Sequence, residues 1–581
     1  MKYILTMLCI FIYIANAQQK LLDVILNISA DGDTLTVAPG SGTLADAINN
    51  DLNPPPGRVY LLQAGYKYYN IPTNITIPSN RPIRIVGSDP TPLVQNHNAS
   101  NHPPIICGDG YNTGGINFCG DLTIKNCAII QASPNGTLGW CFFWSTQPNS
   151  RLTLDNCLLE RTRWTMIAAS NVDSTKIYIR NCYFVNMNGN GGRRSGGVYD
   201  NVDYNTDTIW VENSTHIYGQ GMLYRFRNFP IHKVIFNHNT CINIGHSIFE
   251  TDGYQSNMSV TQNIFINCQT KPYRPNLDIE ETDVDSLPTG IINVRDLPVG
   301  YEQLDRKILV DRNLVYWDPR LANIADTANS IPINRYTNWV SQMIKMNTRT
   351  KSMFDDNTKY PYLTEGTWYN KLPNFERTEN LLGAMVDTLK HYSVAIMDTN
   401  TGAMLPDWRL VFTGPDNYVV SDWPIPIALD YDDAGLTKAA MGNLPLGDLN
   451  WFPAAKATYD ANRDVEYAEI EAALQEGRLL NGSTGVRNTI AVRPMQFRVD
   501  QNYPNPFNPS TTITYQLPTN AFVNLRVYDV LGREVETLVN ERQNAGDHSV
   551  TFNAGNLPSG VYFYRLQAGN YSATKKLLLL K

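Results

Sequence analysis

Charged residues recur along the middle of the chain at a nearly constant distance, 11 to 14 residues, after a repeated asparagine. Arginine dominates this set, although the chain as a whole has a net charge of -7. The members are Arg193, Arg194, Arg225, Arg227, Glu250, Asp252 and Arg274. A guanidinium group binds a carboxylate through two parallel hydrogen bonds, so a strip of arginines could bind an acidic sugar chain. A solvated ladder of ion pairs would give the same pattern.

Cleavage by β-elimination is the chemistry that such a strip would favour for a uronate polymer. The sugar carboxylate must be neutralised, a base must take the neighbouring proton, and an acid must assist the leaving oxygen. Arg225 is the candidate for neutralising the carboxylate, with Arg227 as the alternative. Tyr224 and His246 are the candidates for proton transfer, because both lie near the strip in sequence. The residues predicted to bind substrate are Arg193, Arg194, Arg227, Glu250 and Asp252.

One acidic segment raises the question of a metal. LDIEETDVDS, residues 277–286, holds five carboxylates. Carboxylate oxygens are the ligands that Ca²⁺ prefers, so this segment could bind calcium. The alternative is a solvated insertion whose like charges are held apart in water. No Cys-x-x-Cys pair or Cys/His spacing indicates zinc, so calcium is the one cofactor that the sequence raises.

A short strand pattern that recurs along the chain would position these residues. LTIKN, LTLDN and IYIRN each alternate apolar residues and end in asparagine. Four clear copies end at Asn126, Asn156, Asn181 and Asn213, and looser copies end at Asn239, Asn263 and Asn313. Up to Asn263 the steps are 24 to 32 residues, which is the period of a parallel β-solenoid.

Each turn of such a coil adds a strand about 4.8 Å further along the axis, so equivalent residues stack. Asparagine tolerates the left-handed backbone needed at a sharp corner, and stacked amides can bond to one another. We therefore predict a structural ladder at one corner. Its members are Asn126, Asn156, Asn181 and Asn213.

Three cysteines, Cys127, Cys157 and Cys182, follow ladder asparagines directly. A small thiol packs well in a buried stack, so we predict an unbonded interior stack for these three. Disulfides are the alternative for an exported protein, and the nearest candidate pair is Cys107 with Cys119.

The N-terminal part of the coil resembles the pectate-lyase-like right-handed β-helix superfamily. GTLADAINNDL, residues 42–52, has helical apolar spacing, and the strands RVYLLQAGYKYY and IRIVG follow it. In that superfamily an amphipathic helix plugs the open end of the coil. The resemblance, with the Asn turns, covers roughly residues 25–320 and implies a right-handed parallel β-helix. It does not imply one activity, because the superfamily holds lyases, hydrolases, esterases and non-catalytic adhesins.

The repeat is lost over residues 321–495. TENLLGAMVDTLKHY at 378–392 and DVEYAEIEAALQEGRLL at 464–480 have helical apolar spacing, with Asp464 as a candidate cap. We predict a partly helical capping region that covers the C-terminal end of the coil, since an open sheet edge invites aggregation. The element GDLNW, residues 447–451, resembles the closing segment of secreted β-helix proteins.

The C-terminal residues 496–581 form a separate module with alternating apolar residues and Gly turns, which predicts a small Ig-like β-sandwich. NPFNP at 505–509, YDVLGR at 528–533, LPSGVY at 557–562 and KKL at 575–577 closely resemble the sorting domain of type IX secretion cargo. The resemblance implies that the secretion machinery is a partner, and that the protein is extracellular or attached to the outer-membrane surface.

The N-terminus predicts a signal peptide over residues 1–17, with Lys2, an apolar core and ANA before cleavage at Gln18. No other stretch approaches the ~20 apolar residues of a membrane-spanning helix. The mildly acidic balance argues against a nucleic-acid partner. The predicted organisation is therefore a signal peptide at 1–17, a β-helix at 18–320, a capping region at 321–495 and a sorting domain at 496–581.

Two function classes fit an exported β-helix of this composition. The first is a protein that binds, and if catalytic cleaves, an acidic polysaccharide by lyase chemistry. The second is a non-catalytic surface, adhesin or structural protein. The 32 Tyr and 10 Trp suit sugar stacking and strand packing equally. The sequence leaves open the particular polysaccharide, metal dependence and the oligomeric state.

Overall fold

The computed structural model describes residues 14–580, with gaps. The residues left out are 80, 110–113, 134–135, 171–172, 188–196, 203, 228, 252, 274–286, 299, 331–338, 396–404, 414–417, 482–497, 500, 503, 518–520, 544–545 and 570. The chain forms two compact units, residues 1–485 and 486–581, which are described separately.

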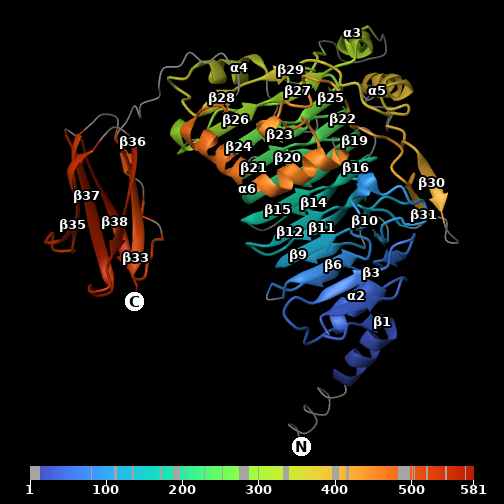
Figure 1. The fold of residues 1–581 in the computed structure, drawn as a ribbon, viewed down its shortest axis with the longest axis horizontal. Helices are drawn as coiled ribbons and strands as arrows, with labels where there is room; N and C mark the ends of the chain where they lie inside the picture. Colours follow the sequence, from blue (N-terminus) through green and yellow to red (C-terminus); the bar gives the residue numbers. More distant parts are fainter. Residues whose placement is uncertain are drawn as a thin grey trace, which may run out of the picture. The chain divides into compact units, whose positions relative to one another are not determined.

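Three long sheets run along the first unit (Figure 1). Sheet A consists of β1 (Ile25–Ile28), β2 (Thr34–Val37), β3 (Val59–Leu62), β6 (Ile83–Gly87), β9 (Asp121–Lys125), β12 (Arg151–Asp155), β15 (Thr175–Arg180), β18 (Thr206–Glu212), β21 (Ile231–Asn237), β24 (Gln255–Thr261), β26 (Lys307–Asp311) and β28 (Leu363–Glu365). Its strands pair in parallel, except that β1 is antiparallel to β2.

Sheet B consists of β4 (Tyr68–Asn70), β7 (Ile105–Cys107), β10 (Ala128–Ile130), β13 (Leu158–Glu160), β16 (Tyr183–Val185), β19 (Thr215–Gly219), β22 (Thr240–Ile244), β25 (Ile264–Cys268), β27 (Asn313–Tyr316) and β29 (Trp368–Tyr369). Sheet C consists of β5 (Ile75–Ile77), β8 (Ile116–Phe118), β11 (Cys141–Ser145), β14 (Thr165–Ala169), β17 (Gly197–Asp200), β20 (Tyr224–Phe226) and β23 (Phe249–Thr251). The chain visits A, B and C in turn, so the predicted parallel β-helix is confirmed.

Equivalent residues of successive turns stack as predicted. Leu122, Leu152 and Ile177 pair in adjacent strands of sheet A, and all three side chains are buried in one continuous core. Leu, Ile and Phe at such inward positions are in contact with the turns above and below, which is how a solenoid buries apolar surface. The core therefore extends along the axis of the coil.

The corner between sheets A and B holds the predicted ladder. Asn126, Asn156, Asn181 and Asn213 all have φ between 45° and 57°, the left-handed region that asparagine tolerates. The Asn156 side-chain amide donates to the Asn126 side-chain oxygen at 2.9 Å, whereas Asn181 donates to the Asp155 carboxylate at 2.9 Å. The four residues thus share one backbone position, but their side chains do not form one continuous amide ladder.

Later turns change residue type at this corner. The left-handed position is occupied by His238, Gln262 and Arg312, with φ of 53° to 61°. Asn239 and Asn263 stand one residue further on, at the position that cysteine occupies in earlier turns. Their buried amides continue a second ladder, with Asn239 donating to Asn263 at 3.2 Å. The looser sequence copies were therefore assigned one residue out of register.

The eight cysteines that the structure describes are all free thiols. Cys127, Cys157 and Cys182 are buried in the core of the coil. Burial raises the pKa of the Cys127 thiol well above its usual value, and the neighbouring Cys157 adds to the rise. The alternative pairing of Cys107 with Cys119 is not formed, and the Cys119 sulfur contacts the Thr146 hydroxyl at 3.1 Å.

Short elements close the two ends of the coil. At the N-terminal end, α2 (Thr43–Asn50) buries Leu44, Ala47 and Ile48, the apolar residues that predicted a plug helix. At the other end, residues 291–294 and α4 (Thr348–Asp355) add buried side chains to the core. The 3₁₀ turns are Leu93–Gln95, Gln303–Asp305, Pro319–Leu321, Met441–Asn443 and Leu449–Trp451.

Much of the predicted capping region lies along the sides of the coil rather than over its end. The helix α6 (Pro453–Glu476) runs across sheet A (Figure 1). There Arg463 pairs with the buried Glu212 at 2.9 Å, and Asn237 donates to Glu466 at 2.8 Å. The helices α3 (Ile324–Asn329) and α5 (Ala384–Ala395) lie near the C-terminal end.

Sheet B is covered by the segment from about residue 405 to 452, which includes the hairpin β30 (Leu410–Thr413) and β31 (Tyr418–Ser421). The Ser421 N–H donates to the buried Glu160 carboxylate at 2.9 Å. Thr215 donates its hydroxyl to Asp448 at 2.7 Å and accepts from the Trp451 ring N–H at 2.9 Å. The GDLNW element therefore fixes this segment on sheet B.

The second unit is a sandwich of two antiparallel sheets. One contains β32 (Arg498–Val499), β33 (Ser510–Leu517) and β36 (Gly546–Asn553). The other contains β35 (Glu534–Gln543), β34 (Ala521–Tyr528), β37 (Gly560–Ala568) and β38 (Tyr571–Leu579). Side chains from both sheets, among them Phe552 and Tyr564, form its own buried core together with Phe507, which precedes β33.

Candidate functional site

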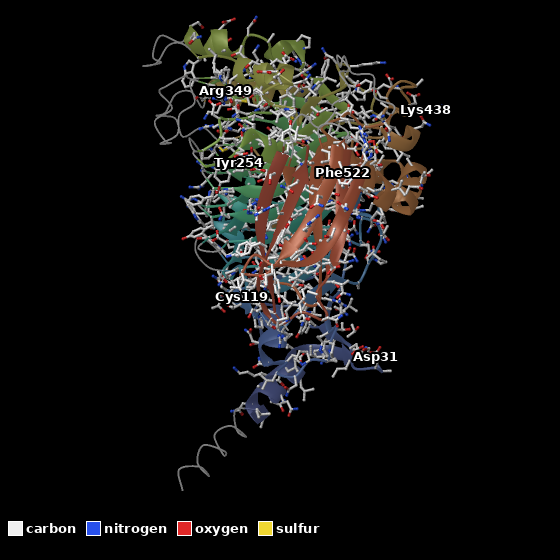
Figure 2. All side chains as sticks on the ribbon, turned by 90° about the vertical axis from the view of Figure 1, so that its left-hand side faces the viewer. Asp31, Cys119, Tyr254, Arg349, Lys438 and Phe522 are labelled. Atoms are coloured by element: carbon white, nitrogen blue, oxygen red, sulfur yellow. The ribbon has the colours of Figure 1, made fainter. Side chains whose placement is uncertain are left out.

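The outer face of sheet C is the candidate binding surface of the coil. Sheet A carries α6 and sheet B carries the segment up to residue 452, whereas no helix in the described part of the chain packs extensively on sheet C. Cys119 and Tyr254, which follow the sheet C strands β8 and β23, lie on the same side of the coil, away from Lys438 (Figure 2). Along this face Trp144 and Arg225 are partly exposed, whereas Ala168, Asp200 and Glu250 are buried, so a ligand could reach the face at the partly exposed positions.

Charged residues do meet on this face. Asp200, Arg225 and Glu250 pair directly across the adjacent strands β17, β20 and β23, so their side chains form one row. Arg225 and Glu250 are two of the predicted site residues. Asp200 lies next to Arg225 in this row, on the side away from Glu250, and the sequence pattern did not point to it.

Asp200 organises both arginines. Arg227 binds its carboxylate in a two-point geometry, with Nε and Nη2 donating at 2.7 and 2.8 Å. The Arg225 guanidinium lies 3.8 Å from the same carboxylate. Asp200 is 2% exposed, whereas the side chains of Arg225 and Arg227 are 18% and 25% exposed. The carboxylate is thus a buried anchor that holds two partly exposed cations.

Glu250 and His246 are linked through Ser247. The Ser247 hydroxyl donates to Glu250 at 2.9 Å and lies 3.1 Å from the His246 Nδ1 atom. The same Nδ1 accepts the Ser247 backbone N–H at 2.8 Å. In the neutral ring the proton is therefore on Nε2, because Nδ1 is engaged as an acceptor. This polar chain fixes the orientation of His246 at the side of the charged row.

The prediction for Tyr224 is wrong. Its side chain is fully buried inside the coil, where the hydroxyl is 2.9 Å from His216 Nε2 and the ring packs against Phe236 and Phe249. Burial raises the pKa of Tyr224 well above its usual value. Tyr224 therefore cannot transfer a proton to a substrate on the outer face.

Several predicted residues lie outside the described part of the chain. They are Arg193, Arg194, Asp252, Arg274 and the acidic segment 277–286. Within the described residues, no group of three or more His, Cys, Asp or Glu side chains could hold a metal ion. Calcium binding by the acidic segment stays a prediction.

A cluster of tryptophans extends the charged row, and the sequence reasoning did not single it out. Trp144 pairs with Ala168 in β14, and Ala168 pairs with Asp200, so Trp144 belongs to the same outward row. Its ring lies 5.7 Å from that of Trp164, which lies 5.5 Å from Trp140. All three rings are partly exposed. The signal in the sequence was three of ten tryptophans within 25 residues.

A cation also contacts these rings. The Arg163 guanidinium lies 5.6 Å from the centroid of the Trp140 ring, within the range of a cation–π interaction. The row from Trp144 to Glu250 crosses five strands, β11, β14, β17, β20 and β23. At about 4.8 Å between neighbouring strands it is roughly 19 Å long. One end of the row is aromatic and the other is charged.

Comparison with known proteins bears on the second unit. Residues 501–580 match the family model described as a secretion system C-terminal sorting domain. The predicted sorting domain is therefore confirmed, and with it export by type IX secretion to the cell surface or the extracellular space. The class is thus a parallel β-helix protein delivered by type IX secretion. No curated protein matches the chain.

The described helices give no indication of a membrane span, because none is both long and apolar enough to cross a bilayer. The predicted signal peptide falls mainly on residues 1–13, outside the described part of the chain, and cleavage before Gln18 stays a prediction.

Proposed function

We propose that the outer face of sheet C binds a polysaccharide, and that the ligand is an acidic one. The observation that carries this proposal is the single row that joins Trp144 to Asp200, Arg225 and Glu250 across five adjacent strands. A row roughly 19 Å long is suited to an extended polymer rather than to one small molecule. The export of the protein supports the proposal, because extracellular polysaccharides are accessible to it.

The two ends of the row suit different parts of a sugar chain. Partly exposed tryptophan rings offer flat apolar surface to the C–H face of a sugar, while their edges remain in contact with neighbouring rings. Arg225 and Arg227 offer N–H donors to carboxylates and hydroxyls. The buried Asp200 holds both guanidinium groups near one position, which reduces the entropy that binding must otherwise overcome.

Cleavage of the bound polymer is the second candidate. It is supported by Ser247, whose hydroxyl donates to Glu250 and whose backbone N–H donates to His246 Nδ1. With Nδ1 accepting the Ser247 N–H, the His246 Nε2–H is the atom that could assist a leaving oxygen, and Arg225 could neutralise a uronate carboxylate. The burial of Tyr224 and the 4% exposure of His246 favour binding over cleavage.

Calorimetric titration of the full chain with uronate and neutral polysaccharides tests binding. We expect Trp144→Ala and Arg225→Ala to weaken binding of a uronate polymer. Matched controls on the outer face of sheet A are Tyr178→Ala and Arg84→Ala, which should leave binding unchanged. If Trp144→Ala and Arg225→Ala bind the uronate polymer as tightly as the wild type and the two control variants do, sheet C is not the binding site. Absorbance of unsaturated products in the same mixtures distinguishes cleavage from binding.

A further inference from the structure

The hairpin that joins β34 to β35 in the sorting domain presents two large aliphatic side chains to solvent. Val530 is 67% exposed and Leu531 is 74% exposed. Turn positions of this kind normally carry Gly, Asn, Asp, Ser or Pro, because these residues fit the backbone and tolerate water. Two adjacent aliphatic residues at a turn tip therefore call for an explanation.

The turn holds these side chains outward by construction. The Asp529 carboxylate accepts the backbone N–H groups of Leu531 and Arg533 at 2.9 and 3.0 Å. The Arg533 Nε donates to the same carboxylate at 2.7 Å. Gly532 has a φ of 76°, a left-handed conformation that other residue types rarely adopt. The tip is thus a fixed shape and does not result from loose packing.

The two side chains have no part in the stability of the sorting domain. Its buried core is formed by residues such as Val523, Leu525 and Val527 of β34. Val530 and Leu531 are neither in that core nor packed against it. Exposed apolar surface is unfavourable in water, so a clamped turn that displays it is typical of a surface that contacts another protein.

We propose that Val530 and Leu531 are the contact through which the sorting domain docks on a protein of the type IX secretion machinery. The match of residues 501–580 to a sorting domain identifies the partner as a component of that machinery. The partner surface is an apolar pocket that receives the two aliphatic side chains. Arg533, 74% exposed although it is paired with Asp529, lies at the rim of the contact. The proposal is independent of polysaccharide binding.

Export in a bacterium with an active type IX system tests the proposal. The test variant is the full chain with both Val530→Ser and Leu531→Ser. The amounts of this variant and of the wild-type protein in the periplasm and outside the cell are measured by immunoblot. We expect the exported fraction to fall about tenfold, the effect of losing 1.4 kcal/mol of binding free energy. The variant Phe522→Ser is the matched control, because Phe522 is 59% exposed on β34 but lies near the end of that strand away from the turn.

Two further measurements separate docking from folding and from lipid binding. The conservative pair Val530→Ile and Leu531→Met should restore export, and the serine variant should unfold at the same temperature as the wild type. Export of the serine variant at the wild-type level would overturn the proposal. A second result would also overturn it. If the wild-type chain binds vesicles of phosphatidylethanolamine and phosphatidylglycerol and the serine variant does not, the tip contacts a membrane and not a protein.

Discussion

Arg227 binds the buried carboxylate of Asp200 through two hydrogen bonds, although the two residues lie on neighbouring turns of the coil and are 27 residues apart in sequence. Arg225, on the strand next to Asp200, lies further from the same carboxylate, at 3.8 Å. The two arginines of the row therefore have different roles. Arg227 neutralises a buried charge of the protein, whereas Arg225 makes only the longer ion pair with that charge, and we propose Arg225 as the ligand-binding arginine of the two.

Replacing Arg227 should destabilise the coil. In Arg227→Ala the Asp200 carboxylate stays buried and loses two charge-assisted hydrogen bonds, which should cost about 1–3 kcal/mol of unfolding free energy. Urea denaturation measures the loss. The double variant Arg227→Ala with Asp200→Asn should recover part of it, because the buried charge is gone. A double variant less stable than Arg227→Ala would contradict this role for Asp200.

Replacing Arg225 should affect binding more than stability. Arg225→Ala should weaken binding of a uronate polymer by about 1–3 kcal/mol, the usual contribution of a hydrogen bond to a charged group. Binding by the wild type should also weaken as salt is raised from low to physiological ionic strength, since the guanidinium is partly exposed. Titration at two salt concentrations checks both effects. If Arg225→Ala weakens binding of a neutral polymer as much as it weakens binding of the acidic one, Arg225 does not recognise the charge of the ligand.

The coil was predictable because its pattern is local and repeats. A left-handed corner restricts the residue type, so Asn126, Asn156 and Asn181 could be recognised from the chain alone. The same pattern failed at Asn239 and Asn263, which are one residue further on. There the asparagine is selected by side-chain hydrogen bonds along the axis, and sequence spacing does not distinguish the two uses.

The candidate site was predicted only in part, for two physical reasons. Neighbouring residues of a strand point to opposite faces, so Tyr224 and Arg225 could not both face a ligand. This alternation can be read from the sequence alone. Asp200, in contrast, joins Arg225 through strand register across two turns, and register depends on the lengths of the intervening loops.

The start of α6 was also missed, because Asp464 was the candidate cap, whereas the helix begins at Pro453 with Phe452 as its N-cap. Its N-terminal half packs on sheet A through polar contacts. Tyr459 donates to the buried Glu212 at 3.0 Å, and Arg463 pairs with the same carboxylate. A helix that is held by buried polar groups lacks the apolar periodicity on which sequence prediction depends.

The cysteine stack should be chemically inert in the native protein. Seven of the eight free thiols described are buried, and Cys119 alone is partly exposed. Burial raises the pKa of Cys127, Cys182 and Cys241, and the reactive thiolate is correspondingly scarce. In the chain without residues 1–17, we expect one thiol to react with a chromogenic disulfide at pH 8, and all eight to react in denaturant. Fewer than eight in non-reducing denaturant would indicate a disulfide.

Glu160 should make stability depend on pH. Burial beneath the 405–452 segment raises its pKa to about 7, against the opposing effects of the Ser421 N–H and of Arg161. The folded protein therefore holds this proton more tightly than the unfolded chain, whose carboxyl titrates near 4.5. The stabilising contribution is complete below pH 4.5 and is lost as pH rises to about 7, a change of about 3 kcal/mol.

Comparing Glu160→Gln with the wild type isolates this contribution. The glutamine cannot ionise, and its carbonyl oxygen can still accept the Ser421 N–H. Between pH 4.5 and 7 the unfolding free energy of the wild type should therefore fall relative to that of Glu160→Gln, and the two curves should run parallel above pH 8. Urea denaturation at half-unit steps of pH measures both, with the exposed Glu302→Gln as control. Curves that stay parallel from pH 4.5 to 8 would show that Glu160 does not hold its proton in the folded state, and that the contact between sheet B and Ser421 is made by an ionised carboxylate.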